Sequence, residues 1–148
     1  MRIAVYDFDE TIAHEPRTAA MFSNLMGKRV DAIRKAKPGP ALGYLRRDHH
    51  SGIPIYILTA RSKTPENAIG IQRFLSAYGI HIPIQQIYMT GENSGEAKAR
   101  AMHWIIRKHK PHQLSFYDDL IDNIRAIDGL ISTYPHIQIK TYHVSPIS

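Results

Sequence analysis

The sequence predicts a doubly wound α/β fold with a mostly parallel, Rossmann-like sheet of about five strands. Short apolar segments alternate with segments of helical periodicity along the chain, which favours right-handed crossovers between parallel strands. Several of the apolar segments also stop abruptly at acidic residues or threonine. In sheets of this kind ligands bind beyond the carboxyl ends of the strands, so these stops have functional interest. At 148 residues, we expect a single domain spanning 1–148.

The elements of the first half follow from apolar spacing and from the chain breakers proline and glycine. Apolar residues recur at helical spacing in 17–35, weakened at Gly27, and the Pro-Gly-Pro segment at 38–40 ends that helix. We predict, in order, a strand around 3–5, a loop at 12–16, a helix at 17–35, a short helix at 41–47, a turn at 49–52 and a strand at 53–58.

The second half repeats the alternation of helix and strand. Thr64 before Pro65 is typical of a helix N-terminus, and Gly79 of a helix end. We predict a helix between these residues, a strand at 84–89, a helix at 96–108, a strand at 114–117, a helix ending near 127 and a final strand at 137–144.

Composition narrows the chemistry. The chain has no cysteine, so a metal site must use carboxylates or the nine histidines, whose spacing suggests no metal site. No apolar segment approaches the roughly 20 residues needed to span a bilayer. The N-terminus does not resemble a signal peptide, and we expect a cytoplasmic protein. The net charge of +6 favours anionic partners such as phosphorylated molecules or nucleic acid.

The first strand leads into Asp7, Asp9 and Thr11. Residues two apart in an extended chain project to the same side, so the two carboxylates are expected to lie together. Carboxylates at the end of a buried strand need partners, and a magnesium ion suits such hard oxygen ligands. An alternative is that Asp9 or Thr11 only caps the following helix. The first motif alone does not decide between them.

Three further polar residues follow later strands: Thr59 after the second, and Asp118 and Asp119 after the fourth. Each could serve as a helix cap, because acids and threonine favour helix N-termini. The parallel sheet would nevertheless bring all of them to one edge, together with the acids of the first strand.

Lys98 lies in the first turn of its predicted helix, where a positive charge opposes the helix dipole. It shares a face with Met102 and Ile105, so the ammonium should point towards the sheet and an anionic group. We expect such a lysine to serve function rather than folding, so Lys98→Ala should preserve or raise stability. Arg61 either contacts a substrate or forms a surface ion pair, and we favour the latter.

These residues, in this order, resemble the haloacid dehalogenase-like (HAD) phosphohydrolase superfamily. The matching motifs are Asp7-Phe8-Asp9-Glu10-Thr11, Thr59 in Leu-Thr-Ala-Arg, Lys98, and Asp118-Asp119, and they cover the chain from Arg2 to about Asn123. Glu10 departs from the pattern, since many members carry glycine there.

The resemblance implies an Mg²⁺-dependent phosphatase that works through an aspartyl-phosphate. Asp7 would be the nucleophile and Asp9 the general acid and base. Asp7, Asp118 and the Asp9 backbone carbonyl would hold Mg²⁺. The phosphate-binding residues would be Thr11, Thr59 and Lys98. Asp119 and Asp122 would not bind the ion themselves but would orient the groups that do.

The spacing between the motifs leaves no room for a full cap domain, so we expect a small capless member with an open site and a helical insert or lid at 17–50. Such members often act on macromolecular phosphates, including nucleic acid ends. The alternative is a small-metabolite or nucleotide phosphatase with 17–50 as its lid. A phosphoacceptor signalling domain would carry its acidic pair first and its lysine last, unlike this order, and a non-catalytic nucleic-acid binder leaves the acids unexplained. The substrate and oligomeric state stay open.

Overall fold

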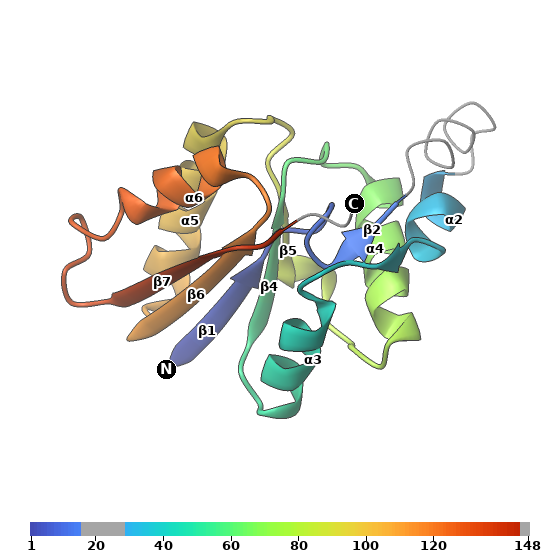
Figure 1. Cartoon of the computed structure of the whole chain (residues 1–148), viewed down its shortest axis with the longest axis horizontal. Coiled ribbons are helices and arrows are strands. Elements are labelled where there is room, and N and C mark those ends of the chain that lie inside the picture. The colour runs from blue at the N-terminus through green and yellow to red at the C-terminus, as the bar shows by residue number, and fades with distance from the viewer. Residues whose placement is uncertain (16–28, 146–148) are drawn as a thin grey trace.

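The computed structural model describes residues 1–15 and 29–145 and is built around one five-stranded parallel sheet (Figure 1). The spatial order is β5-β4-β1-β6-β7, with every neighbouring pair parallel. The strands are β1 (Arg2–Tyr6), β4 (Ile55–Thr59), β5 (Ile87–Met89), β6 (Gln113–Asp118) and β7 (Gln138–His143). The predicted fold class is therefore confirmed, and β1 lies at the centre of the sheet.

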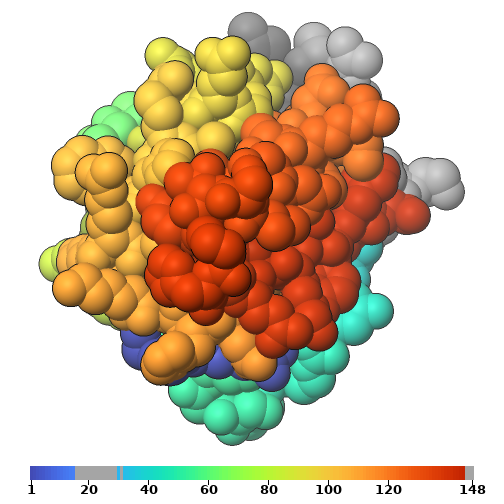
Figure 2. All heavy atoms as spheres, turned by 90° about the vertical axis from the view of Figure 1, so that its left-hand side faces the viewer, coloured from blue at the N-terminus to red at the C-terminus, as the bar shows by residue number. Residues whose placement is uncertain are grey.

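Helices lie on both faces of the sheet, as the crossovers require. One face packs against α2 (Arg29–Arg34), α3 (Leu42–His50) and α4 (Pro65–Ala77), and the other against α5 (Gly95–His109) and α6 (Ile121–Asp128). Figure 2 shows that α6 and the segment leading into β7 form much of one side of the molecule. No helix in the described ranges is both long and apolar enough to cross a membrane.

The central strand explains why the sheet is buried on both faces. Ile3 and Val5 point into the core beneath α5 and α6, and Ala4 and Tyr6 into the core beneath α3 and α4. All four are fully buried. Such a strand has an uninterrupted apolar sequence because neither of its faces meets water.

Several predicted boundaries differ from the structure. The segment expected to be a loop at 12–16 contains β2 (Ala13–His14), which pairs antiparallel with β3 (Lys37–Pro38). The predicted third strand begins as a 3₁₀ turn, η1 (Ile84–Gln86), before β5, because Pro83 precedes it and only the last residues reach β4. Of the predicted 17–35 helix, α2 is described and residues 16–28 lie outside the described part.

Two helix N-termini next to the polar edge of the sheet are capped by side chains. The Thr64 hydroxyl accepts from Asn67 N at 3.2 Å, with Pro65 in the first turn, as predicted. Ser94 accepts from Ala97 N at 3.1 Å and starts α5. The second cap fixes the position of the first turn of α5, and therefore the position of the Lys98 backbone.

Gly39 supports the loop that follows β1. Its N–H donates to the carbonyl of Ile12 at 3.0 Å, and Ala41 N donates to the carbonyl of Thr11 at 2.7 Å. A Cβ on Gly39 would lie 2.6 Å from the Thr11 oxygen and 2.8 Å from Ala13 N. These neighbours are backbone atoms, so only glycine allows this close approach.

Gly39→Ala should therefore lower the free energy of unfolding by about 1–3 kcal/mol, because the added methyl must displace the loop after β1. Gly43→Ala is the matched control: it lies in α3, and an added Cβ would meet no atom within 4 Å. Alanine there should stabilise the protein by about 0.5–1 kcal/mol. Urea denaturation measures the free energy of unfolding of both variants. A stabilising Gly39→Ala together with a destabilising Gly43→Ala would contradict the proposed contact.

Candidate active site

The polar residues predicted at strand ends meet at the carboxyl edge of the sheet. Asp7 follows β1, and Asp118 ends β6, which is the direct neighbour of β1 in the sheet. Thr59 ends β4, the neighbour on the other side. The three side chains are buried. The parallel register thus places two carboxylates and a hydroxyl on adjacent strands, at one edge.

Lys98 bridges the two carboxylates. Its ammonium lies 2.7 Å from Asp7 Oδ1 and 2.6 Å from Asp118 Oδ2, and the side chain is 2% exposed. The structure thus places Lys98 as the spacing with Met102 and Ile105 predicted, inward from the first turn of α5. An ammonium this deep in the protein must be paired, and here it has two charged partners.

Asp118 is held by three donors. Lys98 and the amide of Asn123, 3.1 Å away, donate to Oδ2, and Leu120 N donates to Oδ1 at 2.9 Å. Asn123 is buried and was missed by the sequence analysis, although its position three residues into the helix after the acidic pair is a usable signal. Asp122, predicted to support the metal site, is exposed in the first turn of α6. The structure does not bring it into this cluster.

Thr11 and Asp119 complete the surroundings of Asp7. The Thr11 hydroxyl donates to Asp7 Oδ2 at 3.1 Å and lies 3.5 Å from Asp119 Oδ1. Thr11 is fully buried, and Asp119 is partly exposed. Each oxygen of Asp7 therefore has a donor, Lys98 on one and Thr11 on the other, so the orientation of this carboxylate is fixed.

The cluster carries more negative than positive charge. Burial raises the pKa of Asp7 well above its usual range, and the charge of Asp118 adds to this, while Lys98 opposes it. Burial raises the pKa of Asp119 as well. For Lys98, burial lowers the pKa, but the two carboxylates outweigh it and the net pKa is raised. One ammonium does not balance three carboxylates, and a further cation would relieve the excess.

The donor set fits Mg²⁺. Carboxylate oxygens of Asp7, Asp118 and Asp119 all lie within 4.8 Å of one another. Three hard oxygen donors from rigid strand ends are what magnesium requires from a protein that leaves its other positions to water and substrate. Asp7 and Asp118 are the predicted ligands, and Asp119 is close enough to contact the ion or its water.

Asp9 has a different environment from Asp7. Arg61 donates to both of its oxygens, from Nη2 at 2.7 Å and from Nε at 2.8 Å. The Arg61 side chain is only 19% exposed and is held in place by Asn67 at 3.2 Å and Glu15 at 3.6 Å. The predicted ion pair of Arg61 is present, but the guanidinium is largely buried and its partner is a candidate catalytic acid.

Thr59 and Glu10 show how the backbone shapes the edge. Thr59 is 1% exposed, and its hydroxyl accepts from Arg61 N at 3.2 Å, which holds the turn that carries Arg61. Glu10 has φ +59°, in the left-handed region that favours glycine. This is the position where the family resemblance leads us to expect glycine, and a non-glycine residue there costs roughly 1–2 kcal/mol.

Comparison with known proteins shows which known fold the chain shares. No family model and no curated protein matches the sequence. Among solved structures, the chain is similar to the HAD domain of effector protein Lem4 from Legionella pneumophila, solved both in its native form and as an inactive mutant. In each case 98% of this chain aligns with 86% of the other, at a TM-score of 0.63 and 18% identity. The chain has a HAD-like fold.

The HAD-like fold and the motif order agree on where chemistry would occur. In the structure, Asp7, Thr11, Lys98, Asp118 and Asp119 form one connected cluster at the edge where a doubly wound sheet binds ligands. Thr59 and Asp9 are linked to each other through Arg61, outside this cluster. The placement supports the predicted site, and the role of each residue stays a prediction.

The burial of Lys98 between two carboxylates argues against the expectation that its removal preserves stability. Without the ammonium, Asp7 and Asp118 would be two buried carboxylates that repel each other. Lys98→Met should lower the free energy of unfolding by about 3–5 kcal/mol, the usual effect of removing one partner of a buried ion pair.

Denaturation in the presence of a chelator tests this, because an added cation could replace the lysine charge. The matched control is Lys108→Met, an exposed lysine of the same helix, expected to change stability by less than about 0.5 kcal/mol. Equal stability of the Lys98→Met variant and the wild type would show that the ammonium does not hold the cluster together.

Proposed function

We propose that the protein is an Mg²⁺-dependent phosphomonoester hydrolase that acts through an aspartyl-phosphate on Asp7. The observation that carries this proposal is the fixed carboxylate of Asp7 between Lys98 and Thr11, with Asp118 and Asp119 within reach of a shared cation. The similarity to the Lem4 HAD domain supports a HAD-type phosphohydrolase in general.

In the first step an oxygen of Asp7 attacks phosphorus and the bond from phosphorus to the leaving oxygen breaks. A single carboxylate held by donors on both oxygens needs little reorganisation to attack in line. In the second step water attacks phosphorus, the bond to Asp7 breaks, and inorganic phosphate leaves. Bound Mg²⁺ would supply charge neutralisation between the carboxylates and the phosphoryl group.

Lys98 contributes positive charge beside the reacting carboxylate. Its ammonium is buried and already directed at Asp7 Oδ1, so it can stabilise charge on the transferring phosphoryl oxygens as they approach. Thr59 and Thr11 are the predicted hydroxyl contacts of the same group. In the structure the Thr11 hydroxyl donates to Asp7 and would have to turn to bind phosphate, whereas the Thr59 hydroxyl accepts from Arg61 N and can still donate its own proton.

Asp9 is the proposed general acid and base. It gives its proton to the leaving oxygen in the first step and takes one from water in the second. Its side chain is 44% exposed and therefore accessible to a substrate, unlike that of Asp7. The bidentate pair with Arg61 occupies both carboxylate oxygens, so Asp9 must leave this pair, at least in part, to contact a leaving oxygen.

The preferred substrate is a phosphate on a nucleic acid end or other macromolecule, because we expect no cap domain to exclude water from the site. The alternative, a small metabolite with 17–50 as a lid, depends partly on residues 16–28, which lie outside the described part. The described remainder packs against the core: Ile33 of α2 lies against Gly70 of α4, and Leu45 of α3 is fully buried.

Asp7→Asn should abolish phosphate release while the protein stays folded, because an amide can keep the Lys98 contact but cannot act as nucleophile. Phosphate release from a panel of esters should also stop when a chelator removes the metal and return when Mg²⁺ is added. Circular dichroism of the variant confirms folding. Near-wild-type turnover by Asp7→Asn would contradict the assigned nucleophile.

Asp9→Asn should slow hydrolysis of esters with poor leaving groups by about 10²–10⁴-fold, and much less for activated esters that need no proton. Combining Arg61→Ala with Asp9→Asn tests whether the two residues act together. If Arg61 acts through Asp9, its replacement should have less effect in the Asp9→Asn background than in the wild type. Equal losses for both ester types in Asp9→Asn would argue against Asp9 as the acid.

A further inference from the structure

Three tyrosines form a stacked ladder across neighbouring strands. Tyr6 of β1 pairs in register with Tyr117 of β6, which pairs with Tyr142 of β7. The ring centroids are 4.4 Å and 4.7 Å apart, with interplanar angles of 3° and 15°. Tyr44 of α3 stacks on the middle ring at 5.8 Å and 20°. Tyr6 and Tyr117 are buried within this stack, whereas Tyr142 on the edge strand and Tyr44 of α3 remain exposed.

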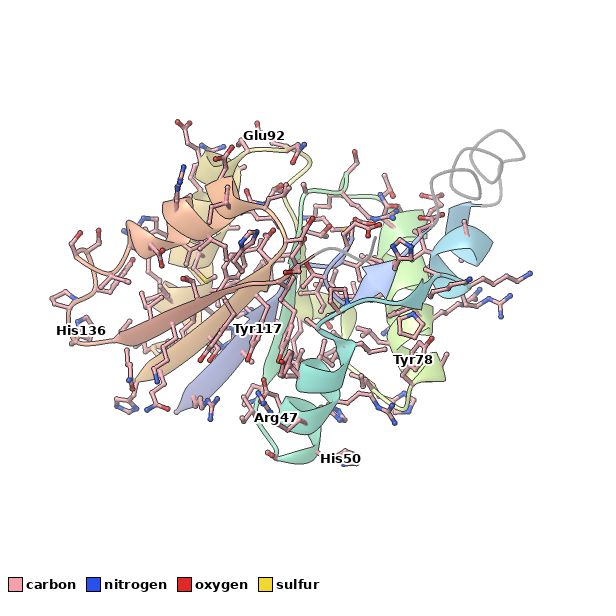
Figure 3. All side chains as sticks on the ribbon, viewed as in Figure 1. Arg47, His50, Tyr78, Glu92, Tyr117 and His136 are labelled. Carbon is pink, nitrogen blue, oxygen red and sulfur yellow. The ribbon has the colours of Figure 1, made fainter. Side chains whose placement is uncertain are left out.

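This ladder lies on the half of the sheet where helical cover thins out. On that face α3 packs against β1 and β4, and a cavity of about 850 Å³ extends between α3 and the end of β7. Figure 3 shows Tyr117 and Arg47 near each other, between β6 and α3. Tyr44 and Tyr142 line the cavity and remain 49% and 40% exposed. Parallel sheets normally cover both faces, so an open aromatic half is unusual.

The charges around the cavity are positive. Arg2 and Arg47 line it, and Lys140 lies on the same face in a smaller adjoining pocket. Arg47 also lies over the Tyr44 ring, 5.2 Å from its centroid. The acidic residue in the lining, Asp48, is 2% exposed and accepts from Tyr6 Oη at 2.5 Å. A polyanion would therefore meet cations and the exposed rings of Tyr44 and Tyr142 here.

One end of the cavity lies beside the strand end that carries Asp118 and Asp119. His143 and Val144 line its upper end, where Val144 N donates to the carbonyl of Asp118 at 2.9 Å and His143 Nε2 to that of Asp119 at 2.9 Å. The backbone that ends β6 thus separates the aromatic face from the carboxylate cluster by the thickness of one strand end.

We propose that this surface binds single-stranded nucleic acid, with a base stacked on the exposed ring of Tyr142 and the backbone held by the surrounding cations. Stacking platforms combined with basic side chains are the general solution for single strands, whose bases have free faces. A phosphopeptide would use the charge, but its phosphorylated residue carries no planar base to stack on the exposed ring of Tyr142. Resting on the proposed hydrolase function, the bound strand would present a terminal phosphate to Asp7.

Binding of a fluorescently labelled, unphosphorylated oligonucleotide, measured by anisotropy with chelator present, tests the surface without any catalysis. Tyr142→Ala should weaken binding about 10-fold, whereas Tyr142→Phe should retain it, because stacking needs the ring and not the hydroxyl. Lys140→Gln should weaken binding and reduce its salt dependence. Thermal unfolding confirms that each variant is folded.

The matched control is Trp104→Ala. Trp104 is 69% exposed on α5, in a separate groove of about 660 Å³ that also contains Lys63 and Lys108. It should bind like the wild type. A loss in Trp104→Ala but not in Tyr142→Ala would overturn the proposal, as would equal affinity for duplex and single strand, or for a phosphopeptide of matched charge.

Comparing hydrolysis of small esters with oligonucleotide binding separates the hydrolase proposal from the binding-surface proposal. If the wild type hydrolyses small esters but binds no oligonucleotide at low salt, the surface assignment is wrong and the hydrolase stands. If Tyr142-dependent binding occurs without hydrolysis of any phosphate, the surface stands and the hydrolase is wrong. If both occur, Tyr142→Ala should lower kcat/KM for a terminally phosphorylated oligonucleotide about 10-fold relative to a small ester.

Discussion

The ammonium of Lys98 between Asp7 and Asp118 is the interaction on which the carboxyl edge of the sheet depends. It joins three elements that are distant in sequence, because Asp7 follows β1, Asp118 ends β6 and Lys98 comes from the helix that connects β5 to β6. Two buried carboxylates on adjacent strands would otherwise repel each other in a medium of low polarity. The lysine therefore stabilises the fold at the same place where it can act on an anion, and the two roles cannot be separated by position.

Asp7 and Asp9 lie in different environments. They are two residues apart, yet Asp7 lies in the buried cluster with Lys98, whereas Asp9 is nearly half exposed and paired with Arg61. The turn at Glu10, with φ +59°, comes directly after Asp9. Two like groups in unlike environments can do different chemistry, and the proposed mechanism accordingly makes Asp7 the nucleophile and Asp9 the acid and base. The backbone after β1 produces this difference without any change of residue type.

The parts of the site that the sequence predicted are those set by local periodicity and strand ends. The inward position of Lys98 follows from its spacing with Met102 and Ile105 on one helix, and the meeting of Asp7 with Asp118 follows from parallel strand order. What it missed depends on side-chain partners far apart in the chain. The pair between Asp9 and Arg61 joins residues 52 apart, and no local pattern distinguishes it from a surface ion pair.

The tyrosine ladder belongs to the same category, because it arises from strand register and not from sequence spacing. Tyr6, Tyr117 and Tyr142 share no sequence motif, and they align only because β6 pairs in parallel with both β1 and β7. Their strands end at the edge that holds the carboxylate cluster, so the register that stacks the rings also orders the site. On the proposed assignments, a large anionic ligand would have two places to bind: a base on the exposed Tyr142 ring and its phosphate beside Asp7. A small phosphate ester can occupy only the second, and it is this asymmetry that favours a macromolecular substrate.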